Sequence, residues 1–551
     1  MKDFSILTLP ALLQQSVKKY GKRPAVAFVD ETPLTYYEFD KQRLSVISLL
    51  EKLKIQSGDR VALLSTNMPN WGISYFAIAS MGAIVVPILP DFSENEVTNV
   101  LNHSEAKAIF ISQGLKSKIE NFRQDALLHR ILIDDFSIIE TNGLDVQFEE
   151  GLKPLKEHFV AEDDLAVIIY TSGTTGKSKG VMLTHKNISS NAVASMGVQE
   201  INSGDRFLSV LPLSHTYENT IGFILPIICG ASIFYIKKPP TPAVLLPALK
   251  TVRPTLMLTV PLIIEKIYRS KVLPTFNKSK LTRTLYAFPP MRKKFNQLAG
   301  KKLMRTFGGE LKFFGIGGAK LDKTVEKFLR EAKFPYAIGY GLTETSPLLA
   351  GVNALHTKLQ STGPPLTGVT LKIHKPGKLT GEGEIWAKGP NVMKGYYKEP
   401  ELTREVMTED GWFKTGDLGI LDETNYLYIR GRSKNVIIGS TGENIFPEDI
   451  ESVINNFKHV SESLVIQQKG KLVAMVHFNR EEIEGKYQHL KGELSEFVEE
   501  KCEELSKELH EYVNARVNKF SKIQKVMLQK EEFVKTATKK IKRFLYTAAP
   551  A

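Results

Sequence analysis

The sequence predicts an α/β protein, with a large N-terminal domain of parallel-rich sheets and helices followed by a small C-terminal α+β domain. Three observations lead to this fold class. Short apolar runs alternate with stretches of helical periodicity along most of the chain, and strands alternating with helices favour parallel sheets. From about Ile385 the chain becomes richer in Gly, Asp and Lys. After Lys434 a new apolar pattern begins, which indicates a further unit.

The N-terminal part opens with helices and then alternates between strands and helices. Residues 11–21 and 36–53 have apolar side chains at helical spacing, so both segments are expected to be helices. Unbroken apolar runs of strand length then recur. These runs are RVALLS (60–65), AIVVPIL (83–89), KAIFIS (107–112) and LAVIIY (165–170).

The longest uncharged apolar stretch runs from Ile221 to Ile236. It is shorter than the roughly 20 residues that a spanning helix needs, and Pro226 and two glycines interrupt it. We therefore expect a buried helix followed by a strand. The N-terminus carries an acidic residue and lacks a small-residue cleavage pattern, so no signal peptide is expected.

Residues 412–437 are typical of short antiparallel strands joined by polar turns. Residues 482–517 are highly charged with helical spacing. A domain boundary is expected within 431–435. The predicted domains are therefore 1–431 and 432–551.

Composition excludes some classes of protein and leaves others open. The chain has 551 residues, of which 42% are hydrophobic, and only two cysteines. Two cysteines provide neither a disulfide framework nor a thiolate zinc site, which favours a reducing, cytosolic compartment. The net charge of +13 would attract nucleic acid, anionic lipid, or the phosphates of a nucleotide or of CoA.

Much of the positive charge lies between Lys271 and Lys312, where basic residues alternate with Leu, Tyr, Phe and Met. One interpretation is a solvated pair of helices with a basic face. The other is a basic-aromatic surface that rests on a membrane interface.

The stretch YTSGTTGKSKG follows a predicted buried strand and contains GKS, yet it is not a P-loop. The P-loop pattern requires a glycine where this chain has Thr171. Glycines that free backbone N–H groups, hydroxyl donors and lysines are nevertheless suited to a polyphosphate. A solvated Ser/Gly linker is the alternative. The candidate phosphate-binding residues are Thr171, Ser172, Gly173, Thr174, Thr175, Gly176 and Lys179.

Six further stretches fit a nucleotide site. LPLSHTYEN places His215 after a buried strand, and FFGIGGAKL places small residues at a strand end, where a ligand can approach the backbone. GYGLTETSP combines an aromatic ring, hydroxyls and the acid Glu344. TGDLG supplies Asp417, and RGRSKN supplies Arg430, Arg432 and Lys434. The tail VKTATKKIKR adds a group of basic residues.

In this order, the motifs resemble the adenylate-forming superfamily, and most closely its long-chain fatty acyl-CoA synthetases. The resemblance covers nearly the whole chain, from LTYYEFD to FVKTATKKIKR. It implies two half-reactions: a carboxylate attacks the α-phosphate of Mg-ATP to give acyl-AMP and pyrophosphate, and a thiol then displaces AMP. It also implies a small barrel-like subdomain and a mobile C-terminal domain. The expected substrates and cofactors are ATP, Mg²⁺, CoA and a fatty acid.

The resemblance assigns roles to individual residues. Lys540 is similar to the lysine that bridges the carboxylate and the α-phosphate, and Thr343 to an α-phosphate contact. Glu344 is similar to the magnesium ligand; magnesium needs few carboxylates because phosphate and water complete its shell. His215 is expected to gate the thiol tunnel or line the acyl pocket. The expected nucleotide contacts are Tyr340 on adenine, Gly317, Gly318, Ala319 and Gly341 along the same slot, and Asp417 and Arg432 on the ribose.

Domain rotation is part of the same resemblance. Lys434 falls on the position of the hinge, and the loop around Gly442 is expected to approach the thiol tunnel after rotation. The chain departs from the family pattern at two positions. Lys539 stands where glycine is usual, so two adjacent lysines compete for the catalytic role, and Ser178 stands where proline is usual.

Several alternatives remain open from the sequence. The acceptor is CoA or, in an acyl-AMP ligase, an acyl-carrier protein, and the acid is a long-chain, short or aryl acid. The apolar stretch beside His215, with small Gly222 and Gly230, favours a long acyl chain. A basic membrane-surface or RNA-binding protein with a vestigial loop is a competitor from another class. The preferred prediction has no nucleic-acid partner, has peripheral contact with the inner face of a membrane, and leaves a homo-oligomer open.

Overall fold

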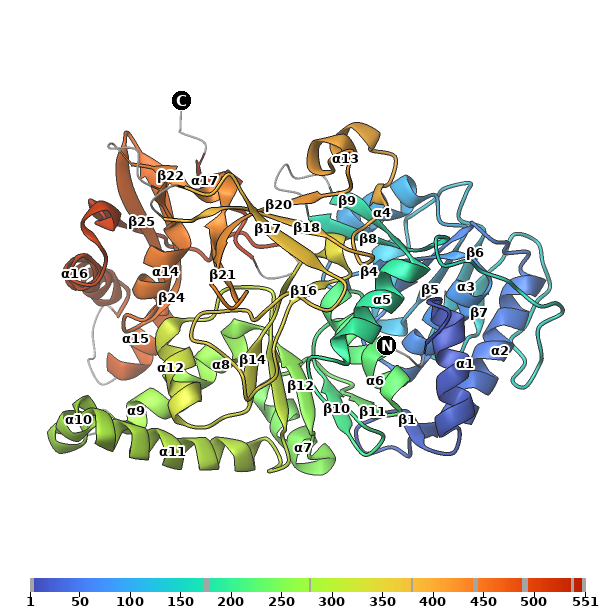
Figure 1. Cartoon of the computed structure of the whole chain (residues 1–551), viewed down its shortest axis with the longest axis horizontal. Coiled ribbons are helices and arrows are strands. Elements are labelled where there is room, and N and C mark those ends of the chain that lie inside the picture. Colours follow the sequence, from blue (N-terminus) through green and yellow to red (C-terminus); the bar gives the residue numbers. More distant parts are fainter. Residues whose placement is uncertain are drawn as a thin grey trace.

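The computed structural model describes residues 4–172, 178–276, 279–377, 380–439, 444–487, 494–536 and 540–547. Two large sheets with helices between and around them form the N-terminal part, and smaller sheets follow toward the C-terminus (Figure 1). The predicted α/β fold class with a C-terminal α+β part is confirmed.

The first large sheet has seven strands and is parallel except at its β1–β2 edge. Crossover connections through helices place consecutive strands side by side, as parallel pairing requires. In spatial order its strands are β14 (Tyr336–Ile338), β13 (Phe313–Ile316), β12 (Leu256–Thr259), β10 (Arg206–Ser209), β11 (Ser232–Tyr235), β1 (Pro24–Phe28) and β2 (Leu34–Thr35).

The second large sheet has eight strands, with a parallel centre and antiparallel edges. The predicted apolar runs at 60–65, 83–89, 107–112 and 165–170 lie in this sheet, so these predictions are confirmed. In spatial order its strands are β19 (Gly395–Tyr396), β9 (Ser178–Thr184), β8 (Leu165–Ser172), β4 (Ile84–Ile88), β3 (Arg60–Leu64), β5 (Ala108–Ile111), β6 (His129–Leu132) and β7 (Ile138–Glu140).

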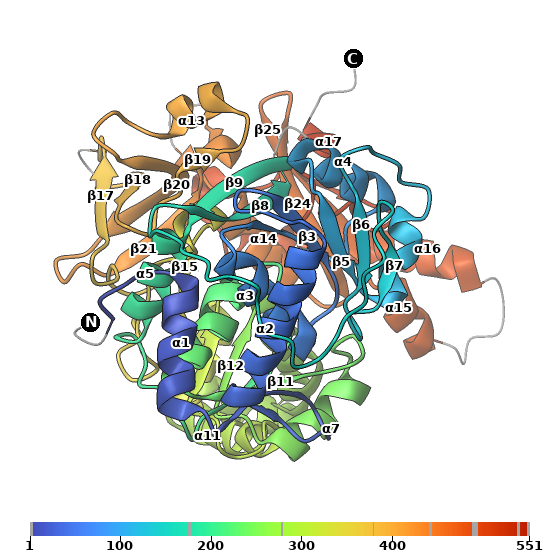
Figure 2. The ribbon, with the colours of Figure 1, turned by 90° about the vertical axis from the view of Figure 1, so that its right-hand side faces the viewer.

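Strand β3 shows why these runs are apolar throughout. Val61 and Leu63 face the core between the two sheets, whereas Ala62 and Leu64 face the core on the outer side. Successive side chains of a strand point to opposite faces, so a strand buried on both faces has no polar positions. Helices α1, α2 and α3 lie between the two sheets (Figure 2).

Helix ends follow local capping chemistry. Thr35 and Glu38 form a capping box at the start of α2, and Ser93 and Glu96 do the same for α4. The helices of the large part are α1 (Leu9–Tyr20), α2 (Tyr36–Lys52), α3 (Pro69–Ser80), α4 (Glu94–Ser104), α5 (His185–Ser195), α6 (Leu225–Cys229), α7 (Pro242–Val252), α8 (Pro261–Ile267), α9 (Leu273–Phe276), α10 (Lys280–Ala287), α11 (Pro289–Thr306), α12 (Lys323–Glu331) and α13 (Pro400–Val406). Short 3₁₀ or π segments are η1 (Gln113–Ile119), η2 (Glu218–Ile224), η3 (Tyr268–Val272), η4 (Thr343–Thr345) and η5 (Ser433–Asn435).

An antiparallel region connects the large sheets to the C-terminal part. A two-stranded ribbon, β15 (Tyr340–Gly341) and β16 (Leu348–Ala350), precedes a four-stranded sheet. The predicted antiparallel strands within 412–437 are confirmed as the paired strands β20 and β21. The sheet is composed of β17 (Thr370–His374), β18 (Gly383–Lys388), β20 (Phe413–Leu421) and β21 (Leu427–Arg432).

The C-terminal part has its own apolar core, which contains residues from Ile445 to Ile523. The predicted boundary at 431/432 falls at the end of β21 and stays a prediction. The elements are β22 (Ile437–Ile438), β23 (Asn444–Ile445), α14 (Pro447–Asn455), β24 (Val460–Gln468), β25 (Lys471–Phe478), α15 (Arg480–Tyr487), α16 (Leu494–Asn514), η6 (Lys519–Ser521), β26 (Lys525–Leu528) and α17 (Phe544–Thr547).

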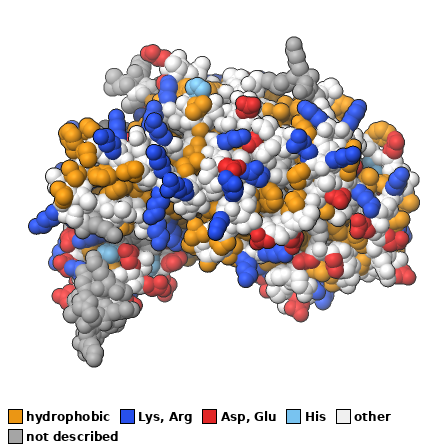
Figure 3. All heavy atoms as spheres, turned by 90° about the horizontal axis from the view of Figure 1, so that it is seen from below, with side chains coloured by type: hydrophobic (Ala, Val, Ile, Leu, Met, Phe, Trp, Pro, Cys, Tyr) orange, Lys and Arg blue, Asp and Glu red, His pale blue; other side chains and the backbone are white. Residues whose placement is uncertain are grey.

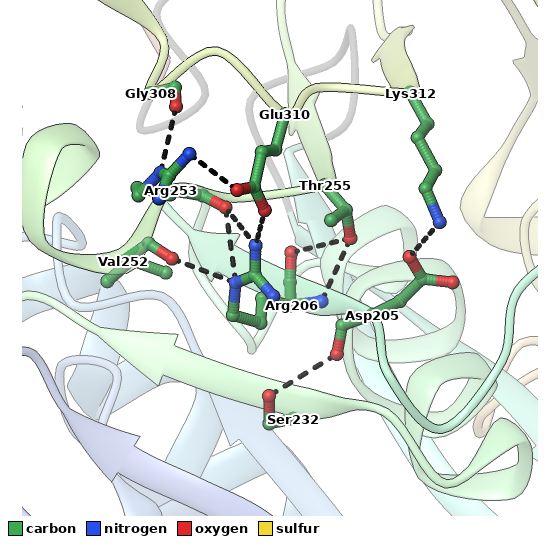
Figure 4. A network of polar contacts seen from close by, with 9 residues as sticks. All are labelled: Asp205, Arg206, Ser232, Val252, Arg253, Thr255, Gly308, Glu310 and Lys312. Carbon is green, nitrogen blue, oxygen red and sulfur yellow. Dashed lines mark hydrogen bonds and ion pairs between the residues drawn. The ribbon is translucent and has the colours of Figure 1, made fainter.

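A polar network fixes the amino ends of the strands in the seven-stranded sheet (Figure 4). Asp205, just before β10, is buried and accepts from Lys312 Nζ at 3.0 Å. The guanidinium of Arg206 donates to the carbonyls of Val252 and Arg253 and pairs with Glu310. This network lies at the amino ends of the strands, so it does not occupy the carboxyl ends at the opposite edge of the sheet.

The apolar stretch Ile221–Ile236 is a buried π and α-helical segment followed by β11, as predicted. The segment around Lys271–Lys312 contains the short helix α9 and then α10 and α11, which carry basic residues, and both interpretations of this segment stay predictions. Within the part of the chain that the structure describes, no helix is both long and apolar enough to cross a membrane.

Candidate active site

The candidate site lies at the carboxyl ends of strands in the seven-stranded sheet, where open α/β sheets bind their ligands. His215 follows β10, and Gly317, Gly318 and Ala319 follow β13. Tyr340 and Gly341 follow β14 directly. The parallel pairing of β13 with β14 therefore places the two Gly-rich loops next to each other.

The phosphate-loop candidates occupy the end of a β-hairpin. Thr171 of β8 pairs with Lys179 of β9, and the two strands lead into residues 173–177. Gly173, Thr174, Thr175 and Gly176 lie outside the described residues, as does the Ser172 side chain. The roles assigned to these five residues stay predictions.

Lys179 and Glu344 meet around a tyrosine. The Lys179 ammonium lies 5.3 Å from the centre of the Tyr396 ring, and the Tyr396 hydroxyl donates to Glu344 Oε1 at 2.9 Å. Burial raises the pKa of Tyr396 and the Glu344 carboxylate adds to this, so the tyrosine is a neutral donor. Tyr396 is not predicted from the sequence, because 52 residues separate it from Glu344 and no local pattern links them.

Glu344 is suited to a hard cation with few protein ligands. One of its oxygens is held by Tyr396, and its backbone carbonyl accepts from Met393 N. The described residues include no group of three or more His, Cys, Asp or Glu side chains arranged to hold a metal. A magnesium ion at Glu344 would use this carboxylate, with phosphate and water supplying its other oxygens.

Asp417 connects the two residues expected to contact adenine and ribose. Its Oδ2 accepts from the Tyr340 hydroxyl at 2.7 Å, and its Oδ1 pairs with Arg432 Nε at 2.8 Å. Asp417 is buried, and burial raises its pKa while Arg432 opposes that rise. The two partners fix both carboxylate oxygens, so the orientation of Asp417 is set before any ligand binds.

Glycine is required at different positions of the two loops for different local reasons. At Gly317 an added Cβ would lie 3.1 Å from the Tyr217 ring, and Gly318 has a positive φ of +85°. At Gly341 a Cβ would lie 1.9 Å from the carbonyl oxygen of Pro347. Gly341 is therefore required by the close approach of β15 and β16, whatever its contact with a ligand.

Lys540 belongs to the C-terminal part and reaches the same cleft. Its side chain is open to solvent, yet the surrounding protein lowers its pKa by desolvation, and Arg432 adds to this effect. Asp417 and Glu344 act in the opposite direction. A lysine with these neighbours is within electrostatic range of the expected ribose and metal sites, which joins the two parts of the chain in one site.

His215 lies near the same lysine. Burial lowers the pKa of His215 to about 4, and the charge of Lys540 contributes. Its Nδ1 accepts from the Tyr217 backbone N–H at 3.2 Å. At neutral pH His215 is therefore an uncharged ring that can line or gate a passage but adds no positive charge.

The structure describes the proposed hinge residue but not Gly442 of the thiol-side loop. Lys434 lies in η5, directly after β21, with an exposed side chain. Gly442 lies outside the described residues, and so does Lys539, the competitor of Lys540. Their roles stay predictions.

An apolar pocket extends from Tyr217 into the large part, between η2 and the seven-stranded sheet. Ile221 lines it, as the sequence suggested, but Gly222 and Gly230 do not. A Cβ on Gly222 would meet the Glu218 carboxyl, and one on Gly230 would meet the Tyr20 ring, so both glycines serve internal packing. Further lining residues are Leu225, Phe207, Leu256, Leu258, Gly315, Ala337 and Leu348.

Comparison with known proteins gives consistent matches. The family model described as AMP-binding enzyme matches residues 13–397. A long-chain-fatty-acid–CoA ligase of Mycobacterium bovis is 30% identical over 82% of this chain and 78% of its own length. A chloroplastic long-chain-fatty-acid–[acyl-carrier-protein] ligase of Arabidopsis thaliana is 29% identical over 86% of this chain and 77% of its own length.

Solved structures agree on the fold. The O-succinylbenzoate coenzyme A synthetase of Bacillus subtilis in complex with AMP is 24% identical, covers 98% of both chains and gives a TM-score of 0.75. A benzoate CoA ligase from Burkholderia xenovorans is 19% identical with a TM-score of 0.76. The two-domain arrangement of this chain is therefore one found in solved structures.

Proposed function

The chain belongs to the family of AMP-binding enzymes, and we propose that it activates a long-chain fatty acid as acyl-AMP and transfers the acyl group to CoA. The relatives named as long-chain ligases support the acid, and the apolar lining of the small pocket behind Tyr217 supports a hydrocarbon group there. The observation that carries the proposal is that Lys540 lies within electrostatic range of Asp417, Glu344 and Arg432.

In the proposed first step, a carboxylate oxygen of the acid bonds to the α-phosphorus of ATP. The bond from that phosphorus to the bridging oxygen breaks, and pyrophosphate leaves with the electron pair. Two anions must meet for this, so positive charge close to both is required. Lys540 and Lys179 are the cations proposed for this task, with Arg432 held by Asp417.

In the proposed second step, the sulfur of CoA bonds to the acyl carbon, and AMP leaves as the carbon–oxygen bond breaks. Asp417 would hold the ribose through both steps, because Tyr340 and Arg432 fix the orientation of its carboxylate. Glu344 would hold magnesium, which when bound offsets phosphate charge. Lys434 is proposed as the hinge for the rotation that withdraws Lys540 between the steps.

The test is to incubate the purified protein with Mg-ATP, a thiol acceptor and carboxylates from acetate to oleate, and to identify products by mass spectrometry. CoA and a holo acyl-carrier protein are offered in separate reactions. Long-chain acyl-CoA together with AMP is the expected result. If acyl-AMP reacts only with the carrier protein, the acceptor is that protein and not CoA. Absence of AMP with every acid would overturn the proposal.

We also propose peripheral contact with anionic membranes through α10 and α11. Residues 280–306 contain eight Lys and Arg and no acidic residue. Leu281, Phe288 and Leu298 are all more than half exposed here. Figure 3 shows basic and hydrophobic side chains gathered on this face of the molecule. Cations beside exposed apolar side chains are suited to an anionic lipid surface, where each Lys or Arg contributes about 1 kcal/mol.

The α11 lysines provide a test that keeps the fold. Phe276, Asn296 and Gly300 are buried, so deleting this region would damage the core and only substitutions are informative. Changing Lys293, Lys294, Lys301 and Lys302 to Gln should lower binding to phosphatidylglycerol vesicles at least tenfold. The matched control changes the exposed Lys22, Lys54, Lys153 and Lys156 to Gln.

The apolar side chains distinguish lipid from nucleic acid. Leu281→Ser with Leu298→Ser should also weaken vesicle binding, because lipid contact includes apolar insertion. Equal vesicle binding by the α11 lysine variant and its control would overturn membrane contact. So would RNA binding that depends on the four lysines without any vesicle binding.

A further inference from the structure

Helix α14 carries two rows of polar side chains with different partners. Asp449, Ser452 and Asn456 are spaced by three and four residues, so they lie along one face of the helix end. Glu448 and Glu451 form a neighbouring row. The first row contacts the large part, and the second contacts the segment that carries Lys540.

The first row meets the loop that follows the expected adenine slot. Ser452 Oγ donates to Asp322 Oδ2 at 2.8 Å, and Asn456 Nδ2 donates to the same oxygen at 2.6 Å. Lys320 Nζ pairs with Asp449 Oδ1 at 2.6 Å. Asp322 lies only four residues beyond Gly318, so α14 is fixed close to the nucleotide loop.

Asp322 is held rigidly on its own side. Its Oδ1 caps α12 by accepting from the backbone N–H groups of Thr324 and Val325, at 2.8 and 3.0 Å. Its own N–H donates to Glu265 Oε1 at 3.0 Å, and the residue is 6% exposed. A buried carboxylate with one oxygen used internally therefore presents the other oxygen to α14 in a fixed direction.

The second row holds the base of the Lys540 loop. Arg543 Nη2 donates to both oxygens of Glu451, at 2.6 and 2.5 Å, and Nη1 donates to the Val465 carbonyl at 3.1 Å. The contacts of Nη2 with Glu451 and of Nη1 with Val465 together fix the orientation of the guanidinium as well as its distance from α14. Glu448, next in the row, accepts from Asn435 Nδ2 at 2.7 Å, directly beside the proposed hinge residue Lys434.

The segments before and after residues 537–539 are hydrogen-bonded to each other. Thr536 N donates to the Lys540 carbonyl at 2.8 Å, and Lys542 N donates to the Val534 carbonyl at 2.8 Å. Arg543 follows three residues after Lys540, so the Arg543–Glu451 pair determines where Lys540 stands relative to α14.

We propose that α14 is a two-sided clamp that positions Lys540 against the nucleotide slot, with Asp322 and Arg543 as its positioning residues. This rests on the proposed function, because it assigns the clamp to the acyl-AMP-forming step alone. The contacts to Asp322 are hydrogen bonds between polar side chains, which exchange readily for water. They hold one arrangement of the two parts and still permit their separation for the second step.

The test separates the two half-reactions. The double variant Ser452→Ala with Asn456→Ala removes both donors to Asp322 and leaves the cap of α12 in place. Acyl-AMP formation, followed as pyrophosphate release, should fall about 10-fold to 100-fold. Thioester formation from supplied acyl-AMP and CoA should stay within about twofold of the unaltered protein.

Asn455→Ala is the matched control. It removes an amide of the same helix whose partner, Ser463 Oγ at 2.8 Å, lies inside the C-terminal part. This variant should leave both half-reactions within about twofold. Hydrogen exchange should rise at residues 320–325 in the double variant and not in the control, which reports loss of the contact without any turnover.

The other side of the clamp has its own variant. Glu451→Gln weakens the pair with Arg543, and Arg543→Lys keeps the charge but loses the planar guanidinium that contacts Glu451 and Val465 together. Both should lower acyl-AMP formation more than thioester formation.

Equal losses in both half-reactions, or unaltered pyrophosphate release in the Ser452/Asn456 variant, would overturn the clamp. The proposed function would still stand if the unaltered protein forms acyl-AMP. A wild-type protein that forms no acyl-AMP would instead reject the proposed function.

Discussion

The core between the two large sheets and the contact between α14 and the 320–322 loop hold the molecule together in different ways. The sheet core is apolar and contains fully buried rings such as Trp71, Phe76 and Phe110. The α14 contact consists of hydrogen bonds and an ion pair. Apolar burial stabilises by exclusion of water, whereas polar contacts exchange with water at little net cost. The difference assigns stability to the first region and controlled separation to the second.

A second polar boundary supports this contrast. Residues of the β4–α4 region and of the segment before and after Lys540 face each other across a polar cavity. Lys118 donates to the Pro90 and Phe92 carbonyls, and Lys535 pairs with Glu462 and Glu532, so these groups are satisfied within their own parts. Separation of the two parts would leave these bonds intact.

Lys540→Ala is expected to have the largest effect and to act only on chemistry. Acyl-AMP formation should fall about 10²-fold to 10³-fold, as when one group that stabilises a transition state is removed. Thioester formation from supplied acyl-AMP should persist. Pyrophosphate release and acyl-AMP consumption measure the two steps.

Lys539→Ala and Lys542→Ala are the controls for assigning the catalytic role to Lys540 and not to a neighbouring lysine. Neither is expected to lower acyl-AMP formation more than about threefold, on the order of a lost surface contact. A larger loss with Lys539→Ala than with Lys540→Ala would move the catalytic role to Lys539. Loss of both steps in Lys540→Ala would indicate damage to the fold.

Phe110→Ala tests the apolar side of the comparison. Phe110 in β5 is fully buried and packs edge-on against Phe136. Its removal should lower the free energy of unfolding by about 3–5 kcal/mol through lost burial and a cavity. Denaturant unfolding followed by fluorescence measures the effect.

Turnover per folded molecule should remain unaltered in Phe110→Ala, unlike in Lys540→Ala. Leu155→Ala is the control, because Leu155 is 77% exposed and should change stability by less than about 0.5 kcal/mol. Similar unfolding midpoints for the two variants would contradict the assignment of stability to this core.

Glu218→Gln should give a pH-dependent effect on stability. Glu218 is buried beside the pocket, accepts from Ser209 Oγ at 2.6 Å, and has its pKa raised by burial from 4.5 to about 8. Between these values the folded protein keeps the proton and the unfolded chain releases it, so stability decreases as pH rises. Gln has no titratable proton at this position, so the variant lacks this dependence of stability on pH.

The stability of Glu218→Gln relative to the unaltered protein should therefore increase by about 1–4 kcal/mol between pH 5 and pH 8. Urea unfolding at the two pH values measures the change. Parallel pH dependence of the two proteins would show that Glu218 is ionised in the folded state.

Tyr396→Phe is expected to have the smallest effect. It removes the hydroxyl that donates to Glu344 and leaves the ring beneath Lys179. A lost hydrogen bond of about 0.5–1.5 kcal/mol predicts a change of about 2-fold to 10-fold in the magnesium concentration for half-maximal pyrophosphate release. Tyr397→Phe, next in the chain, is the control and should leave that concentration unchanged.

The sequence by itself determined the local elements and the order of the motifs. The apolar runs became β3, β4, β5 and β8, and the helical spacing at 11–21 and 36–53 became α1 and α2. These patterns are local, because the period of apolar residues reports the faces that a strand or helix buries. The ordered motifs likewise identified the family, which the match to residues 13–397 supports.

Only the tertiary structure decided which side chains meet. Tyr396 with Glu344, Tyr340 with Asp417, and Asp322 with Ser452 are separated by 52, 77 and 130 residues. It also showed that Gly222 and Gly230 make room for Glu218 and Tyr20 rather than for a ligand. The physical reason is that a pattern in sequence specifies which face of an element is buried, whereas the partner on that face depends on how distant elements pack.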